Sequence, residues 1–518
     1  MKIKSENVDE VVRRFVAIEP LEMGDHPPPW SPGQPDAAKL NELIAAAADD
    51  LPLAYRPAYV EPLSSAVQHL LRSDDNPANV AFNAETLVGA IYQHDRQSAV
   101  RGQLRQFLAV VSNYYRSFLS AAKRHAVHFP MPSDGLPPLA VFQHSGSFGP
   151  FTFPDEMVKK LCGAELSVVS LPQRLRAHPV TWLTVAHETA GHDVLHADPD
   201  LLPELVGAVR TLFGGGPLTP GKQPEPDQLQ ALLWSYWIDE VASDVYALLN
   251  SGPAFAYNMG MFLEALRTIR PGMGASLIRS SPLIPLGIHP PPVLRLHVAI
   301  GVVKNLTSLA PGDRRAHVKN LEVLSKRQVN GTILPVQGRV EVERDRWVDI
   351  EKLNIRLDDF TAAARRVGAF IATAPLQAFD GHTIQEIETW DGDDERVTAI
   401  IAGKFVKNLG DVQAVKNLGD DAQVLAGATL ALLKAPALYD QINSALAGAL
   451  DESHRRDSIM GYAFTHPMFE LEIDPAPPDS QPESDPRAGP QEAGVGAPPL
   501  PVPAEPEPPP PQGSPQAK

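Results

Sequence analysis

The chain has 518 residues, of which 43% are hydrophobic and 21% charged, a composition typical of a soluble globular protein with about two to four domains. Its formal net charge of −17 argues against nucleic acid or an anionic membrane as the main partner, because both require basic patches. The single cysteine, Cys162, excludes an intrachain disulfide scaffold and is typical of a reducing compartment.

Neither a secretory signal nor a membrane span is expected. Residues 1–20 carry charges throughout and lack the apolar core of a signal peptide. No stretch reaches the roughly 18 uninterrupted apolar residues of a spanning helix. The sequence therefore predicts a soluble, cytoplasmic protein without a membrane partner.

The first part of the chain is predicted to be mostly helical. A proline-rich stretch at 24–36 is interpreted as a connector. Residues 84–126 have apolar side chains three and four apart over a long run, which predicts a long helix or a helix pair. Residues 164–172 alternate in polarity and stop at a proline, which predicts a strand.

Helical patterns also dominate the later part. Residues 227–252 predict a helix that stops at a Ser-Gly pair, and 357–375 and 421–450 predict two further helices. Residues 327–347 predict a hairpin that turns at Asn330–Gly331, because Asn-Gly suits the tight turns that join antiparallel strands.

The tail from Pro475 onward lacks aromatic residues and is dense in proline, so it cannot bury enough surface to offset its ordering entropy. It is predicted to be disordered and partly polyproline II. Its proline runs could bind an SH3-like or WW-like reader of Pro-rich motifs, although a solvated tail without a specific reader is the simpler interpretation.

Three histidines and a glutamate lie within ten residues, His187 to His196, of a segment whose composition suits a helix. Zinc hydrolases require two imidazole ligands on one helix face, with a glutamate beside them that acts on water. His187 and His192 are five apart, so on a regular helix they would differ by about 140° around the axis. One wide π-turn repairs this, and Gly191 would let the backbone adjust and approach a neighbour closely.

The hexapeptide that runs from His187 to His192, HETAGH, resembles the HExxGH motif of the dipeptidyl peptidase III family of zinc metallopeptidases. Downstream, the sequence WIDEVASDVYALL resembles the NExxSD pattern of gluzincins, with Asp239 in the place of the usual Asn. The separation of 53 positions from His187 to Glu240 is also similar to the long spacing of the dipeptidyl peptidase III group.

This resemblance implies a zinc-dependent peptidase. It implies that His187, His192 and Glu240 bind Zn²⁺, that Glu188 is the general base towards a metal-activated water, and that Asp244 orients a ligand histidine. The substrate would be a peptide or protein. Substrate peptides in zincin domains pair with an edge strand, a role assigned here to 164–172.

The segment after the second helix, His289-Pro-Pro and then Arg295, resembles the HPPxxxR segment of several zincin families. The resemblance suggests that His289 or Arg295 donates to the oxyanion of a tetrahedral intermediate, or fixes the start of a helix. His289 is therefore included with Glu188 among the candidate catalytic residues.

Two alternatives remain open at this stage. Glu188, His192 and His196 are spaced four and four, so a regular helix would bring them together as a different metal site. The fold could also be kept without activity, which would leave a metal-stabilised, zincin-like interaction protein that presents a Pro-rich tail.

The predicted fold class is mainly α (α+β), with a zincin-like core, a small edge sheet and flanking helical regions. The expected division has four parts: a mostly helical region at 1–140, a catalytic domain at 141–310, a helical region with a possible hairpin at 311–471, and the disordered tail at 472–518.

Overall fold

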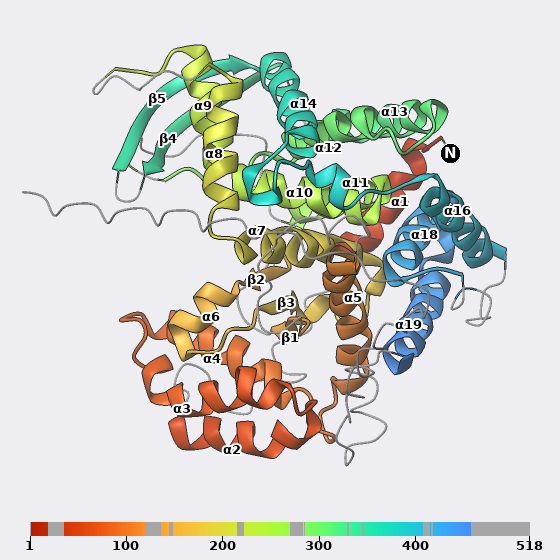
Figure 1. The fold of residues 1–518 in the computed structure, drawn as a ribbon. Helices are drawn as coiled ribbons and strands as arrows, with labels where there is room; N and C mark the ends of the chain where they lie inside the picture. The colour runs from red at the N-terminus through yellow and green to blue at the C-terminus, as the bar shows by residue number, and fades with distance from the viewer. Residues whose placement is uncertain are drawn as a thin grey trace, which may run out of the picture. The chain divides into compact units, whose positions relative to one another are not determined.

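The protein is mainly helical, and five strands form two small sheets among the residues that the structure describes (Figure 1). The computed structural model describes residues 2–18, 36–120, 136–143, 149–214, 222–269, 283, 285–328, 331–343, 346–407, 415 and 418–456. The predicted mainly α class with a small sheet is confirmed. Most of the connector at 24–36 and all of the tail at 472–518 lie outside these residues.

The N-terminal helices include the predicted pair. The run at 84–126 corresponds to two helices, the first of which starts earlier, at Pro77, because the Asn76 side chain caps it by accepting from Ala78 N at 3.0 Å. The helices of this part are α1 (Ser5–Val16), α2 (Ala37–Ala47), η1 (Ala48–Asp50), η2 (Arg56–Val60), α3 (Glu61–Leu70), α4 (Pro77–Tyr92), α5 (Arg101–Ser120) and α6 (Asp155–Cys162).

The central helices carry the histidine motif and the downstream acids. The helix predicted at 227–252 is two helices, because Trp237 leaves the helical conformation while its buried indole donates to the Gly287 carbonyl at 3.1 Å. The central helices are η5 (Gln173–Leu175), η6 (Pro179–Val185), η7 (His187–Asp193), α7 (Val194–Ala197), α8 (Leu201–Leu212), α9 (Pro226–Tyr236), α10 (Ile238–Ser251), α11 (Pro253–Ile269) and α12 (Pro292–Asn305).

The C-terminal helices follow the predicted pattern with one interruption. The helix at 357–375 is confirmed, whereas the run at 421–450 is broken by Pro436, which cannot donate a backbone hydrogen bond. These helices are α13 (Pro311–Arg327), α14 (Leu357–Thr373), η8 (Gln377–Phe379), α15 (Ile384–Ile387), α16 (Gly392–Lys407), α18 (Asp421–Lys434), η9 (Pro436–Leu438) and α19 (Tyr439–Arg456).

The three-stranded sheet has the order β1-β3-β2, formed by β1 (Leu139–Gln143), β2 (Phe151–Phe153) and β3 (Val168–Pro172). β3 is the strand predicted at 164–172, but it is central: β1 pairs with it in parallel and β2 in antiparallel register. Its prediction as an edge strand is therefore wrong, and its full burial reflects partners on both sides. β1 and β2 form the two edges of this sheet. On β1 the Gln93 side-chain amide occupies the edge, because it donates to the Phe142 carbonyl at 2.7 Å and accepts from the Phe142 N–H at 2.9 Å.

The second sheet is a hairpin of β4 (Ile333–Glu343) and β5 (Arg346–Arg356). The hairpin predicted at 327–347 is thus displaced along the chain. The strands connect through 344–345, and Gly331 instead lies between the end of α13 and the start of β4. The Asn-Gly pair was mistaken for the hairpin turn because it lies between a helix and an apolar alternating run.

Residues Met1–Phe469 form one compact unit, and Glu470–Lys518 form a second. The finer division at 140 and 310 stays a prediction. Within the first unit, α12 and α14 pack backbone to backbone, because a Cβ on Gly301 or Gly368 would meet a carbonyl oxygen of the other helix. In the described part of the chain no helix combines the length and apolar character needed to cross a bilayer.

Candidate metal centre

The histidine motif lies on a composite helix whose middle turn is a π-helix, η7, that spans His187–Asp193. The wide turn expected from the five-residue spacing is therefore present. It brings the Nε2 atoms of His187 and His192 to 3.2 Å from each other, with the two rings nearly perpendicular.

Gly191 lets η7 touch α10 directly. A Cβ at this position would lie 2.6 Å from Ser243 Cβ and 2.7 Å from Ser243 Cα, so no larger residue fits without separating the two helices. In Figure 1 the α7 end of the composite helix lies between α10 and β2, and η7 contacts both elements. The contact with α10 brings that helix's acidic first turn alongside the histidines.

Three groups converge between η7 and α10. Glu240 Oε2 lies 3.1 Å from His187 Nε2, and Glu240 Oε1 lies 3.8 Å from His192 Nε2. His187 and Glu240 are buried and His192 is nearly so. The structure thus brings together the three residues predicted as ligands, each offering one ligand-type atom.

The remaining ring nitrogens are bonded to carboxylates. His187 Nδ1 donates to Asp244 Oδ1 at 2.9 Å, and Arg295 holds Asp244 with two hydrogen bonds of 2.6 and 2.7 Å. His192 Nδ1 donates to Asp239 Oδ1 at 2.9 Å. When both rings are neutral, each carries its one proton on Nδ1, which leaves both Nε2 atoms as acceptors.

Two imidazole acceptors and a carboxylate therefore face one another, an arrangement that calls for a cation. Ligand atoms about 2.0–2.1 Å from a tetrahedral zinc ion lie about 3.3 Å apart, close to the separations of 3.1, 3.2 and 3.8 Å found here. Without a metal ion, a proton on His187 can supply the positive charge beside Glu240. Burial and Arg295 lower the pKa of His187, but its hydrogen bonds with Asp244 and Glu240 outweigh both and raise that pKa to about 10.

Glu188, the candidate base, is buried beside this cluster without joining it. Its Oε2 accepts from the Thr152 hydroxyl at 3.1 Å, which ties the carboxylate to the edge strand β2. The alternative site of Glu188, His192 and His196 is therefore not formed, because η7 is not a regular helix. His196 instead faces Asp239.

His289, in the loop before α12, and Arg295, on α12, lie in different surroundings. His289 Nε2 lies 3.1 Å from Glu240 Oε1, and its side chain is 58% exposed. Arg295 is buried against Asp244, so the suggested oxyanion role does not fit it. The His289 loop is held from both sides, because Leu286 N donates to Arg339 O at 2.9 Å and Tyr236 Oη donates to Leu286 O at 2.8 Å.

Three roles at this site were not predicted from sequence: Asp239 was named only as the replacement for the usual Asn, His196 only as a ligand of the alternative metal site, and Thr152 not at all. Asp239 adjoins a predicted ligand, and His196 lies four residues after His192, so spacing alone could have indicated both. Thr152 is 36 residues from Glu188 on a three-residue strand, and no local pattern connects them.

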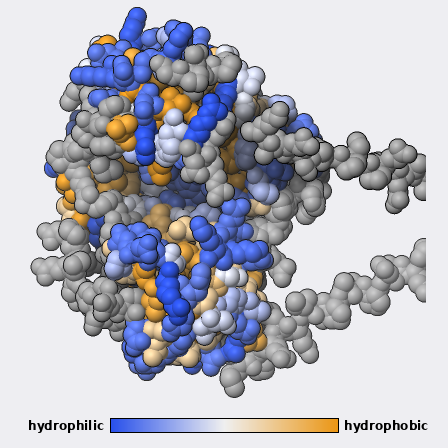
Figure 2. Space-filling view, turned by 90° about the vertical axis from the view of Figure 1, so that its left-hand side faces the viewer, coloured by the Kyte–Doolittle hydropathy of each residue, from blue (hydrophilic) through white to orange (hydrophobic). Residues whose placement is uncertain are grey.

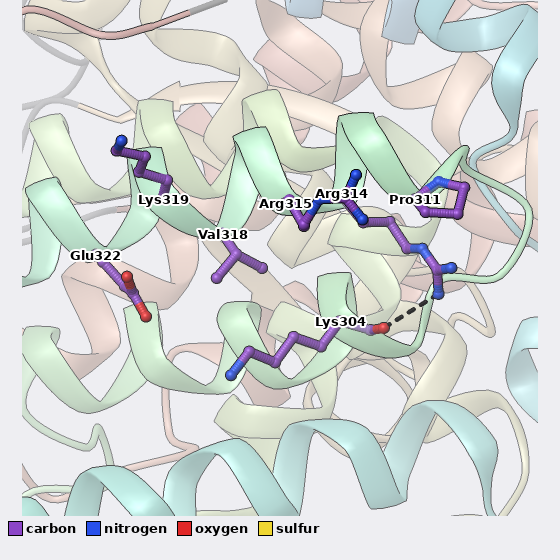
Figure 3. A pocket seen from close by; sticks show the side chains of 7 residues that line it. All are labelled: Lys304, Pro311, Arg314, Arg315, Val318, Lys319 and Glu322. Carbon is purple, nitrogen blue, oxygen red and sulfur yellow. Dashed lines mark hydrogen bonds between the residues drawn. The ribbon is translucent and has the colours of Figure 1, made fainter.

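A separate cavity of about 480 Å³ lies between α12 and α13 (Figure 3). Its lining includes none of the residues of the candidate metal centre and consists of Lys304, Pro311, Arg314, Arg315, Val318, Lys319 and Glu322. Arg314 spans it by donating to the Lys304 carbonyl at 3.2 Å.

Comparison with known proteins yields no assignment: no protein-family model, no curated protein and no solved structure matches the chain.

Proposed function

We propose that the chain is a zinc-dependent metallopeptidase with a zincin-like core, in which His187, His192 and Glu240 hold Zn²⁺. The observation that carries the proposal is the convergence of one ligand-type atom from each of these three residues, all within 4.8 Å of one another. Zinc bound there supplies a Lewis acid that polarises a carbonyl and lowers the pKa of water.

Glu188 is the proton carrier in this proposal. Thr152 occupies its Oε2, and among the described residues Oε1 has no hydrogen-bond partner, so Oε1 is the atom that accepts a proton from water. The same oxygen then delivers the proton to the amine that leaves. The Thr152 hydrogen bond fixes the direction in which Oε1 points.

The peptide substrate is proposed to pair with β2. This strand is a sheet edge and carries Thr152, so a peptide added to it would lie next to Glu188. Figure 2 shows a recess across one face at the level of α7 in Figure 1, with hydrophilic and hydrophobic residues around it. We also propose a cytoplasmic location, on the single cysteine, which is typical of a reducing compartment.

Metal analysis by mass spectrometry tests the ligand set. We expect about one zinc ion per chain in the wild type, and its loss in His192→Ala and in Glu240→Ala. A zinc content in Glu240→Ala equal to that of the wild type would contradict the proposal.

Glu188→Gln tests the chemistry separately. It should retain zinc and lose hydrolysis of a peptide library by a factor of at least about 10². If wild type and variant both hold zinc and neither cleaves any peptide, the alternative of a metal-stabilised interaction protein is favoured.

A further inference from the structure

Asp239 joins two histidines at the rim of the candidate metal centre. Its Oδ1 accepts from His192 Nδ1 at 2.9 Å, and its Oδ2 accepts from His196 Nε2 at 3.2 Å. The side chains of Asp239 and His196 are 37% and 24% exposed, whereas that of His192 is 14% exposed. The hydrogen-bonded chain therefore runs from the protein surface to a proposed ligand.

These three residues could also be interpreted as a second metal site, because each offers a ligand atom. The geometry argues against that interpretation. The two histidines lie on opposite oxygens of one carboxylate, which is the arrangement of two N–H donors bridged by an acceptor. A nitrogen that donates its proton has no lone pair for a metal.

The chain of contacts follows from the π-turn. The π-turn places His192 one residue later than a regular helix would. The regular helix resumes at Val194, so His196 stands one turn beyond His192 and on the same side. Both rings then meet Asp239, which is in the first turn of α10 and next to Glu240.

We propose that His196 is a positioning residue for the metal centre: it fixes Asp239, which holds the His192 ring with Nε2 aimed at the point shared with His187 and Glu240. This inference rests on the proposed function, since it assigns a role towards the same zinc ion. Groups that orient ligands in this way typically contribute 10-fold to 100-fold to metal affinity.

The test is the zinc dissociation constant of the full chain, measured by competition with a chromogenic chelator. His196→Ala should weaken zinc binding by about 10-fold or more. His196→Gln, whose amide can still donate to Asp239, should recover most of that loss. The matched control is His69→Ala, an exposed histidine on α3, which should bind zinc as the wild type does.

A second readout concerns geometry. The visible absorption of Co²⁺-loaded protein reports ligand geometry, so His196→Ala should change that spectrum and His196→Gln should not. Wild-type zinc affinity in His196→Ala overturns the inference alone. A wild type that does not bind zinc overturns the proposed function together with it.

Discussion

Two buried histidine networks in this molecule differ in how their hydrogen bonds are completed. In the first, His187 and His192 direct their Nε2 atoms at each other and at Glu240. In the second, His317 lies between the Tyr257 hydroxyl, 2.6 Å from Nδ1, and Glu395 Oε1, 3.0 Å from Nε2.

The second network is complete by itself. Asn320 Nδ2 donates to the Tyr257 oxygen at 3.3 Å, the hydroxyl donates to His317 Nδ1, and His317 Nε2 donates to Glu395. Each donor meets one acceptor, so no ion is required. The comparison teaches that burial of histidine beside carboxylates does not by itself indicate a metal site; the first network differs because ligand-type atoms of three residues lie close to one another.

The largest expected effect on stability comes from removing the ion pair between Arg295 and Asp244, the carboxylate that holds His187. Arg295→Met should lower the free energy of unfolding by about 3–5 kcal/mol, because it leaves the buried Asp244 carboxylate without its cation. Urea denaturation in a chelating buffer measures this. Arg455→Met, which removes an exposed ion pair of α19, should cost less than about 1 kcal/mol. Equal losses in the two variants would contradict the role given to Arg295.

An intermediate effect is expected when the second network is broken. His317→Ala should cost about 2–3 kcal/mol, since it leaves a cavity and unpaired polar groups on Tyr257 and Glu395. Zinc affinity should stay at the wild-type value. A fall in the zinc affinity of His317→Ala, measured under conditions in which the variant is fully folded, would show that the two networks are coupled.

The smallest expected effect depends on pH and concerns Glu388, near the second network. Burial, together with Asp394 and Asp420, raises the pKa of Glu388 from 4.5 to about 8. The folded state therefore binds more protons than the unfolded state between these values, and stability falls as pH rises from about 4.5 to about 8.

Glu388→Gln removes this titration. The gain in free energy of unfolding that Glu388→Gln gives should be about 1–2 kcal/mol larger at pH 8.5 than at pH 4.5. This figure is smaller than the full pKa difference would give, because Glu388 is only half-buried and solvent screens its charge. Thermal unfolding at both pH values measures the difference, with Glu61→Gln as an exposed control on α3. An equal change at the two pH values would exclude this account.

The sequence was informative where the spacing of neighbouring residues determines the local structure. The spacing of His187 and His192 required a wide turn, and η7 provides it. The helices at 84–126 and 357–375 followed from apolar spacing. Glu240 and Asp244 were indicated by the resemblance of their segment to the NExxSD pattern, and their four-residue spacing places them on one helix face.

Sequence was uninformative where partners are distant along the chain. β3 could not be recognised as central, because β1 and β2 are short strands with no strong alternation of their own. The Thr152–Glu188 hydrogen bond depends on that pairing. For Arg295 the sequence left an oxyanion role and a structural role open, since nothing local shows that it packs against Asp244 of another helix.

The π-turn also bears on how this helix can change in evolution. A π-turn absorbs one added residue while the face presented by the following helix is kept. A codon lost between His187 and His192 would restore the four-residue spacing, which on a regular helix also places both rings on one face. Length variation within this motif is therefore compatible with both histidine rings remaining on one face of the helix.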